Sequence, residues 1–261
     1  MEKTELYRRT EDGSIGFKYA RGDIGIYPKC FHEHYEVFLL LYGEVDYIGE
    51  SVRRTLSPGS LVLIPPGVYH QLLVTGDVRN YERYVLEADP MIAEPLHIPG
   101  EQRLLTSVPD SGVRAVFDRI RGYTSGQFDG DFSALLSSTA AELLILLRYE
   151  RESGSPEDAN GSLDALALRA MEYVNTHLDS PLSAAEIADA CFVSVSSVSH
   201  IFRENYGIPL MQYVRQKKIM QANKLLQDGK GAVETSRLCG YADYSTFYRS
   251  YCREFGHAPS V

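Results

Sequence analysis

The sequence contains no tryptophan, few cysteines and no long apolar run. No stretch approaches the roughly 18 consecutive apolar residues that a membrane-spanning helix needs. The first five residues are polar and acidic, so they lack the apolar core of a secretory signal. The four cysteines form no Cys-x-x-Cys pair, which favours free thiols in a reducing compartment. These absences predict a cytoplasmic protein. The cysteines are Cys30, Cys191, Cys239 and Cys252.

The sequence also lacks the basic excess that is typical of nucleic-acid-binding domains. Its net charge is −9, from 26 Lys and Arg against 35 Asp and Glu. Residues 163–261 hold 10 basic and 10 acidic side chains, so the whole acidic excess lies before them. A neutral C-terminal part can still present a basic face to DNA, whereas an acidic N-terminal part repels it. Charge alone therefore does not decide the function.

Four segments with different hydrophobic patterns predict an α+β protein of two domains. Residues 1–108 hold short apolar runs between Gly and Pro turns, which predict a β-barrel or sandwich. Residues 109–152 carry helical apolar stripes, residues 153–162 are a linker without apolar periodicity, and residues 163–261 are nearly all helical. The expected strands are Tyr35–Tyr42, Val45–Ile48, Leu61–Ile64, Val68–Val74 and Tyr81–Leu86.

Two short helices joined by a tight turn are predicted between Ser183 and Phe202, the layout of a helix-turn-helix. Ser183 and Glu186 have the spacing of a capping box at the start of the first helix. The outer face of the second helix carries short or basic donors that can reach base edges or phosphates in a major groove. An ordinary helical hairpin with a solvated polar face fits this unit equally well. The donors are Ser196, Ser199, His200 and Arg203.

A second unit about fifty residues later decides between these interpretations. Gly240 to Tyr251 reads G-[FY]-x-D-x-S-x-F-x-R-x-[FY], and Gly256 to Pro259 reads G-x-[SA]-P. With this signature, residues 163–261 resemble the DNA-binding domain of the AraC/XylS family of transcription regulators. The resemblance implies two recognition helices in successive major grooves, roughly 34 Å apart. The long helix Met211 to Leu226 is then the spacer between them.

The faces of the second recognition helix follow from its spacing. Phe247 and Tyr251 lie one turn apart on the buried side, and Asp243 is placed to cap the first turn. The outer face is expected to contact DNA through Tyr244, Ser245, Tyr248 and Arg249.

The sequence departs from the family pattern in places. Phe192 stands where relatives usually have Gly in the first turn, and Thr235 and Ser236 replace an expected aliphatic residue and Ala. His200 stands where many relatives carry a stronger base. On the spacer helix, Gln216, Lys217 and Lys218 either contact phosphates or form a solvated face.

The N-terminal part resembles the cupin-like sensor of sugar-responsive regulators. Gly59-x(5)-Pro65-x-Gly67-x(2)-His70 matches the second cupin motif, and His32, His34 and Glu36 resemble the first. The resemblance implies a pocket for a small polar effector such as a sugar, although strand-end histidines without a ligand fit the same pattern. The expected effector-binding residues are His32, His34, Glu36, Tyr42 and His70.

Three imidazoles and a carboxylate would also suit a divalent metal ion. Glu36, however, lies only two residues beyond His34, closer than the first cupin motif places its carboxylate. We therefore predict no metal and no other cofactor.

A leucine stripe that includes Leu135 needs cover, either from the barrel of the same chain or from a second subunit. The family resemblance favours a homodimer. The side chains expected at its interface are Leu136, Leu143, Leu144 and Leu147.

Together these features predict a cytoplasmic, sequence-specific transcription regulator, an activator rather than an enzyme, without catalytic residues. Its expected partners are double-stranded DNA, a small effector, a second copy of the chain and RNA polymerase. A metal-dependent cupin enzyme, such as an isomerase or dioxygenase with a helical appendage, is one alternative. A regulator that works without an effector is the other.

Overall fold

The computed structural model describes residues 4–22, 31–98, 100, 103–105, 112–149 and 163–260. The chain divides into two compact units, Met1–Gly161 and Ser162–Val261, here called the barrel unit and the helical unit. The expected linker, residues 153–162, lies outside the described residues.

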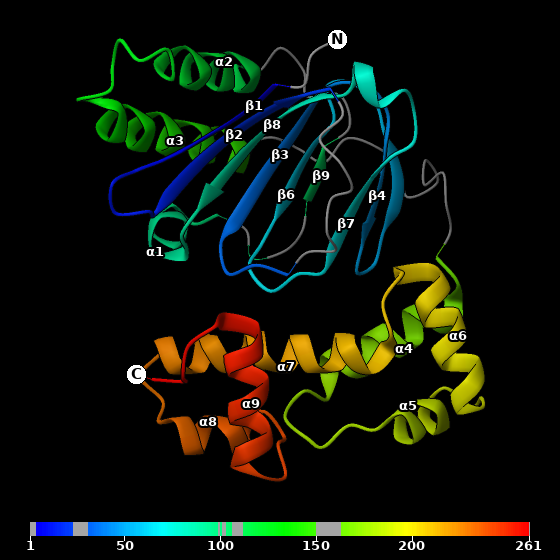
Figure 1. Cartoon of the computed structure of the whole chain (residues 1–261). Coiled ribbons are helices and arrows are strands. Elements are labelled where there is room, and N and C mark those ends of the chain that lie inside the picture. Colours follow the sequence, from blue (N-terminus) through cyan, green and yellow to red (C-terminus); the bar gives the residue numbers. More distant parts are fainter. Residues whose placement is uncertain are drawn as a thin grey trace. The chain divides into compact units, whose positions relative to one another are not determined.

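The barrel unit contains two antiparallel sheets (Figure 1). The larger sheet has the strand order β1-β2-β8-β3-β6-β9, and the smaller has the order β5-β4-β7. The five strand predictions are confirmed to within two residues at each end. The strands are β1 (Thr4–Arg9), β2 (Ile15–Arg21), β3 (Tyr35–Tyr42), β4 (Val45–Gly49), β5 (Arg53–Leu56), β6 (Leu61–Ile64), β7 (His70–Val74), β8 (Glu82–Ala88) and β9 (Arg103–Leu105).

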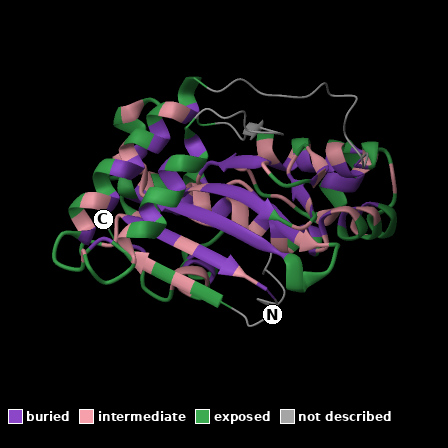
Figure 2. Ribbon diagram, turned by 90° about the horizontal axis from the view of Figure 1, so that it is seen from above, coloured by how far each residue is buried: buried purple, intermediate pink, exposed green. Residues whose placement is uncertain are grey.

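Strand β3 is buried on both faces, as its unbroken apolar sequence predicts. Successive side chains point to opposite sides of a strand, so the odd and even positions enter different cores. Val37 and Leu39 pack with the helices that cover the larger sheet. Phe38 and Leu40 pack between the two sheets, with Tyr47 of β4. Figure 2 shows strands of the larger sheet buried along most of their length.

Helices α2 (Val113–Tyr123) and α3 (Phe132–Tyr149) cover the outer face of the larger sheet. The short helices η1 (Val78–Asn80), α1 (Pro90–Ala93) and η2 (Glu94–Leu96) border β8. By length and composition, α3 is the one helix among the described residues that could cross a membrane. One face of this helix is instead buried in the core of the barrel unit.

The leucine stripe of α3 corrects one expectation. Leu136, Leu143, Leu144 and Leu147 are 0–1% exposed within the single chain and pack against the larger sheet and α2. Because these side chains are covered by their own barrel, they cannot form the expected dimer interface. The amphipathic pattern identified a buried face correctly, but it does not say which surface covers it.

The helical unit contains α4 (Ala165–Thr176), α5 (Ala184–Ala190), α6 (Val195–Tyr206), α7 (Leu210–Gln227), α8 (Ala232–Leu238) and α9 (Tyr244–Phe255). Helix α7, the expected spacer, contacts α6 near one end and α8 and α9 near the other. Figure 1 shows it running between the group α4–α6 and the pair α8–α9.

Both predicted helix caps are confirmed. Ser183 and Glu186 form the capping box at the start of α5. Asp243 caps α9 by accepting a hydrogen bond from the backbone N–H of Thr246 at 2.8 Å. The first cap fixes where the first helix-turn-helix unit begins, and the second fixes where the turn of the second unit ends.

Candidate functional site

The first helix-turn-helix consists of α5 and α6, whose axes differ by 91°. Val198 and Phe202 of α6 are fully buried, and α6 packs against α4 and α5. The opposite face carries the predicted donors: Ser196, His200 and Arg203 are exposed, and Ser199 is half-buried. The second helix of the unit therefore has a free polar side.

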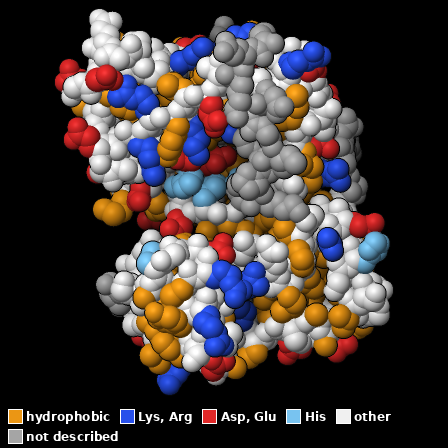
Figure 3. All heavy atoms as spheres, viewed as in Figure 1, with side chains coloured by type: hydrophobic (Ala, Val, Ile, Leu, Met, Phe, Trp, Pro, Cys, Tyr) orange, Lys and Arg blue, Asp and Glu red, His pale blue; other side chains and the backbone are white. Residues whose placement is uncertain are grey.

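The second unit, α8 and α9, has the same arrangement of a buried apolar face and an exposed polar face. Phe247 and Tyr251 are 0% and 1% exposed and pack against Ile219 of α7. On the other side, the structure exposes all four residues that were predicted to contact DNA, Tyr244, Ser245, Tyr248 and Arg249. Figure 3 shows Lys and Arg side chains gathered on one face of the helical unit.

Lys218 of α7 corrects another expectation. It is only 5% exposed, so it belongs neither to a solvated face nor to a phosphate contact. Its ammonium donates hydrogen bonds to the backbone carbonyls of Ser180, Cys239 and Gly240. Ser180 precedes α5, and the other two residues form the turn between α8 and α9. One buried cation thus fastens both helix-turn-helix units to the spacer.

In the barrel unit, the structure brings His32, His34, Glu36 and His70 together. The Nε2 atom of His32 lies 3.6 Å from a carboxylate oxygen of Glu36, and that of His70 lies 4.0 Å from the other. The His32 and His34 rings stack with centroids 4.1 Å apart. Figure 3 shows histidine side chains beside acidic and basic ones on one face of this unit.

The hydrogen bonds of this cluster define its chemistry. The Nδ1 of His32 lies 2.8 Å from the carbonyl oxygen of His34, and the Nδ1 of His70 lies 3.2 Å from that of Val68. A carbonyl only accepts, so each Nδ1 carries the proton, and in a neutral ring Nε2 is then a lone-pair acceptor. Burial lowers the pKa of His32 to about 3, so its ring is neutral near pH 7. The lone pair of His32 faces the Glu36 carboxylate, which is also an acceptor.

The facing acceptor atoms of this cluster need a hydrogen-bond donor or a cation between them. Among the described residues, the Nε2 atoms of His32 and His34 are buried without a hydrogen-bond partner. The hydroxyl of Tyr47, on β4, is likewise buried and without a partner in the described part of the chain. Burial raises its pKa well above the usual value, and the negative charge of Glu36 acts in the same direction. Three polar atoms of this interior thus lack the bonds that buried polar groups require.

Glu87 is a part of this cluster that the sequence did not reveal. It lies opposite Glu36 in the register of β3 and β8, and its Oε1 is 3.6 Å from the Nε2 of His34. It also accepts hydrogen bonds from Lys18 and from Tyr7, the latter at 3.0 Å. No sequence motif marks Glu87, because its position depends on the pairing of two strands far apart in the chain.

Tyr42 does not belong to the cluster. It lies at the far end of β3, six residues and about 20 Å from Glu36, and is 55% exposed. The expectation that it binds the effector with the histidines is therefore corrected.

The donor set does fit a divalent metal ion. His32, His34 and Glu36 each offer a ligand atom, and these atoms lie within 4.8 Å of one another. Imidazole nitrogens and a carboxylate are ligands that zinc and similar ions accept. The short spacing of Glu36, which was the reason to expect no metal, therefore does not keep the carboxylate away from the imidazoles.

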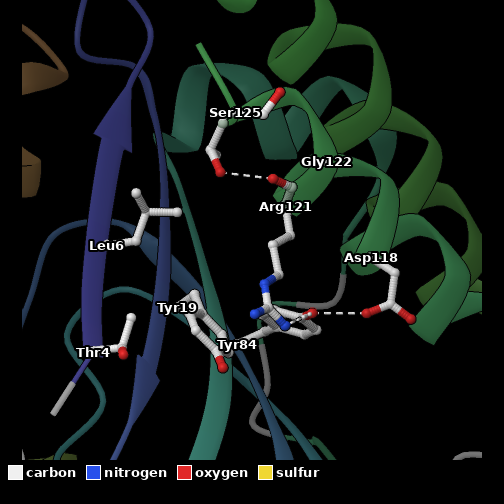
Figure 4. Close-up of a pocket in the computed structure, with 9 residues that line it drawn as sticks. Thr4, Leu6, Tyr19, Tyr84, Asp118, Arg121, Gly122 and Ser125 are labelled. Atoms are coloured by element: carbon white, nitrogen blue, oxygen red, sulfur yellow. Dashed lines mark hydrogen bonds between the residues drawn. The ribbon is translucent and has the colours of Figure 1, made fainter. Parts of the chain in front are cut away.

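A second depression, of about 520 Å³, lies on the outer face of the larger sheet beside α2 (Figure 4). The Arg121 guanidinium lies 3.8 Å from the centre of the Tyr19 ring. The hydroxyl of Tyr84 donates to Asp118 at 2.7 Å. None of the predicted effector residues lines this depression; its contacts fasten α2 to β2 and β8.

Comparisons with known proteins match parts of both units. A family profile described as "Helix-turn-helix domain" matches residues 187–261, and one described as "Cupin domain" matches residues 17–81. The chain is 30% identical over 238 residues to the arabinose operon regulatory protein of Salmonella typhimurium, covering 87% of this chain and 82% of that protein. This chain belongs to the AraC family.

A second sequence relative and a solved structure are also similar to this chain. The HTH-type transcriptional activator RhaR of Cronobacter sakazakii is 27% identical, with 90% of this chain and 86% of that protein covered. ToxT from Vibrio cholerae, a solved structure, is 16% identical over 95% of this chain and 96% of its own, with a TM-score of 0.38. Membership of the AraC family and the helix-turn-helix profile make this protein a transcription regulator with a helix-turn-helix DNA-binding domain, so the enzyme alternative is set aside.

Proposed function

We propose that this protein activates transcription by binding DNA through α6 and α9, in response to a small polyhydroxy effector held in the barrel unit. The observation that supports the DNA-binding part is that α6 and α9 each have one buried face and one exposed polar face. In both units the inner side is buried and the outer side exposes Arg, His, Ser or Tyr. The base-reading residues proposed are Ser196, Ser199, His200, Arg203, Tyr244, Ser245, Tyr248 and Arg249.

The effector proposal rests on the acceptors inside the barrel. The neutral imidazole of His32 and the carboxylate of Glu36 accept hydrogen bonds, and sugar hydroxyls donate them. The relatives named for arabinose support the same class of ligand. A metal ion is the competing occupant. If elemental analysis finds one transition-metal ion per chain and the ion is lost in His70→Ala, the site holds a metal ion and not a sugar.

The experiment uses the full chain. Binding sites are selected from a random duplex library, and affinity is measured across a salt series with and without each sugar of a panel. We expect affinity to fall linearly with salt on logarithmic axes, and one sugar to shift DNA binding or transcription. Glu36→Gln should abolish that shift and leave basal DNA binding unchanged. Binding that is independent of both salt and Arg249 would refute the DNA-binding part.

We further propose a cytoplasmic homodimer that contacts RNA polymerase, with the dimer formed by the outer face of α3. Ile145 and Tyr149, one turn apart on that face, are 39% and 74% exposed. Pairing α3 with its twin would bury both side chains in a two-fold interface. Sedimentation of wild type and Ile145→Glu tests this. We expect a dimer for wild type and a monomer for the variant, because a charge at position 145 disrupts only a dimer that pairs through α3.

A further inference from the structure

The turn between α5 and α6 holds a phenylalanine where both the backbone and the surroundings disfavour it. Phe192 has a φ of 59°, in the left-handed region that favours glycine. Its side chain is 93% exposed, more than any other large apolar side chain in the described part of the chain. A position that combines strain and exposure is one where a functional reason is to be sought.

The second unit shows what the turn itself requires. At Gly240 the backbone has nearly the same φ, 64°. In both units the two residues that follow the cap donate to carbonyls of the preceding helix. Phe192 and Val193 donate to Asp189 and Ala188, each at 3.0 Å, and Gly240 and Tyr241 make the equivalent bonds at 3.0 Å. A glycine therefore satisfies this helix ending, and the ring of Phe192 is not needed to form it.

Phe192 lies just before the end of α6 that is proposed to approach bases. Ser194 is the N-cap of α6, and Phe192 precedes this cap by only two residues. The N-terminal residues of a recognition helix are those that contact base edges in the major groove. Val195, the first residue of α6, is itself 44% exposed. With Phe192 it gives this end an apolar pair, and the first turn contains no Lys, Arg, Asn or Gln.

The major groove offers one apolar group, the 5-methyl of thymine, and phenylalanine is among the residues that contact it. We propose that Phe192, together with Val195, reads thymine in the DNA site of the first helix-turn-helix through this methyl group. The inference rests on the proposed role of α6 as a recognition helix.

The test replaces each thymine of a selected site, one at a time, by deoxyuridine, which keeps base pairing and removes only the methyl group. Full-length wild type should lose about fourfold in affinity at one or two positions of the α6 half-site, the loss expected when one methyl group is no longer buried. Phe192→Gly should lose a similar factor on the unmodified site and be insensitive to deoxyuridine there. Its melting temperature should equal or exceed that of wild type, because glycine relieves the strained backbone.

Two results would overturn the inference. One is equal sensitivity of wild type and Phe192→Gly to deoxyuridine at every position. The other is unchanged DNA binding by Phe192→Gly with lost activation, which would assign the ring to a protein partner such as RNA polymerase. Failure of the proposed function looks different, since wild-type binding would then be independent of salt and of Arg249.

Discussion

Replacing Lys218 by methionine tests how the two helix-turn-helix units are held on one spacer. The ammonium of Lys218 donates to the carbonyl oxygens of Ser180 at 2.6 Å, Cys239 at 2.9 Å and Gly240 at 3.2 Å. Methionine has a similar volume, so it keeps the packing of α7 and removes all three donors. The turn of the second unit and the segment before the first would both lose their anchor.

The magnitude follows from the number of bonds and the burial of the charge. A hydrogen bond to a charged group contributes roughly 1.5–3 kcal/mol net, so three would give at least about 4.5 kcal/mol. Burial lowers the pKa of Lys218, which shows that its charged form carries a desolvation cost that methionine removes. We therefore expect a loss of about 3 kcal/mol in the free energy of unfolding, the lower end of the range for removing one partner of a buried ionic contact.

Urea denaturation of the full chain, followed by circular dichroism at 222 nm, measures this loss. Hydrogen exchange should locate it in the turn 239–240 and in the segment around Ser180. Lys224→Met is the matched control, because Lys224 is exposed on the same helix and its loss should change stability by less than about 0.5 kcal/mol. Equal stability of the two variants would refute the anchoring role of Lys218.

Three further predictions concern other parts of the chain. Thr235→Val should raise the free energy of unfolding by about 1 kcal/mol, because Thr235 is fully buried and its hydroxyl has no partner among the described residues; a lower urea midpoint would contradict this. Arg249→Ala should weaken specific DNA binding by roughly 1–3 kcal/mol with the fold intact. Phe247→Ala should instead lower the free energy of unfolding by roughly 3–5 kcal/mol. Equal effects of the two variants in thermal melts and binding isotherms would contradict the buried and exposed faces assigned to α9. Below pH 6.5 His32 is protonated in the unfolded chain but not in the folded chain, where its pKa is about 3. The free energy of unfolding should therefore fall by roughly 1.4 kcal/mol per pH unit from about pH 6 to pH 4. The same dependence of stability on pH in His32→Gln, measured with chelator, would exclude this cause.

The helical unit could be predicted closely because its signals are local. The caps at Ser183 and Asp243 act on residues three positions away, and the buried pair Phe247 and Tyr251 is separated by one helical turn. Such relations are fixed by helix geometry alone. The buried state of Lys218 could not be predicted, since it depends on carbonyl groups 21 or more residues away in the chain.

The barrel site could be predicted only in part, for a related reason. The sequence groups His32, His34 and Glu36 within five residues at the start of β3, and a cupin-like turn supplies His70. Their distances to one another, and the presence of Glu87, depend on the register between β3 and β8. That register is set by pairing between residues 40 or more positions apart, which no local pattern encodes.

Strand β8 connects the two faces of the barrel unit, because its side chains alternate between them. Glu87 points to the histidine cluster, where it contacts His34 and Lys18. Tyr84, on the opposite face, holds α2 through Asp118 and stacks on Phe117 with ring centroids 5.4 Å apart. Glu87 and Tyr84 therefore connect the histidine cluster and the anchor of α2 to one strand. Helix α2 packs on α3 in the same hydrophobic core as β8.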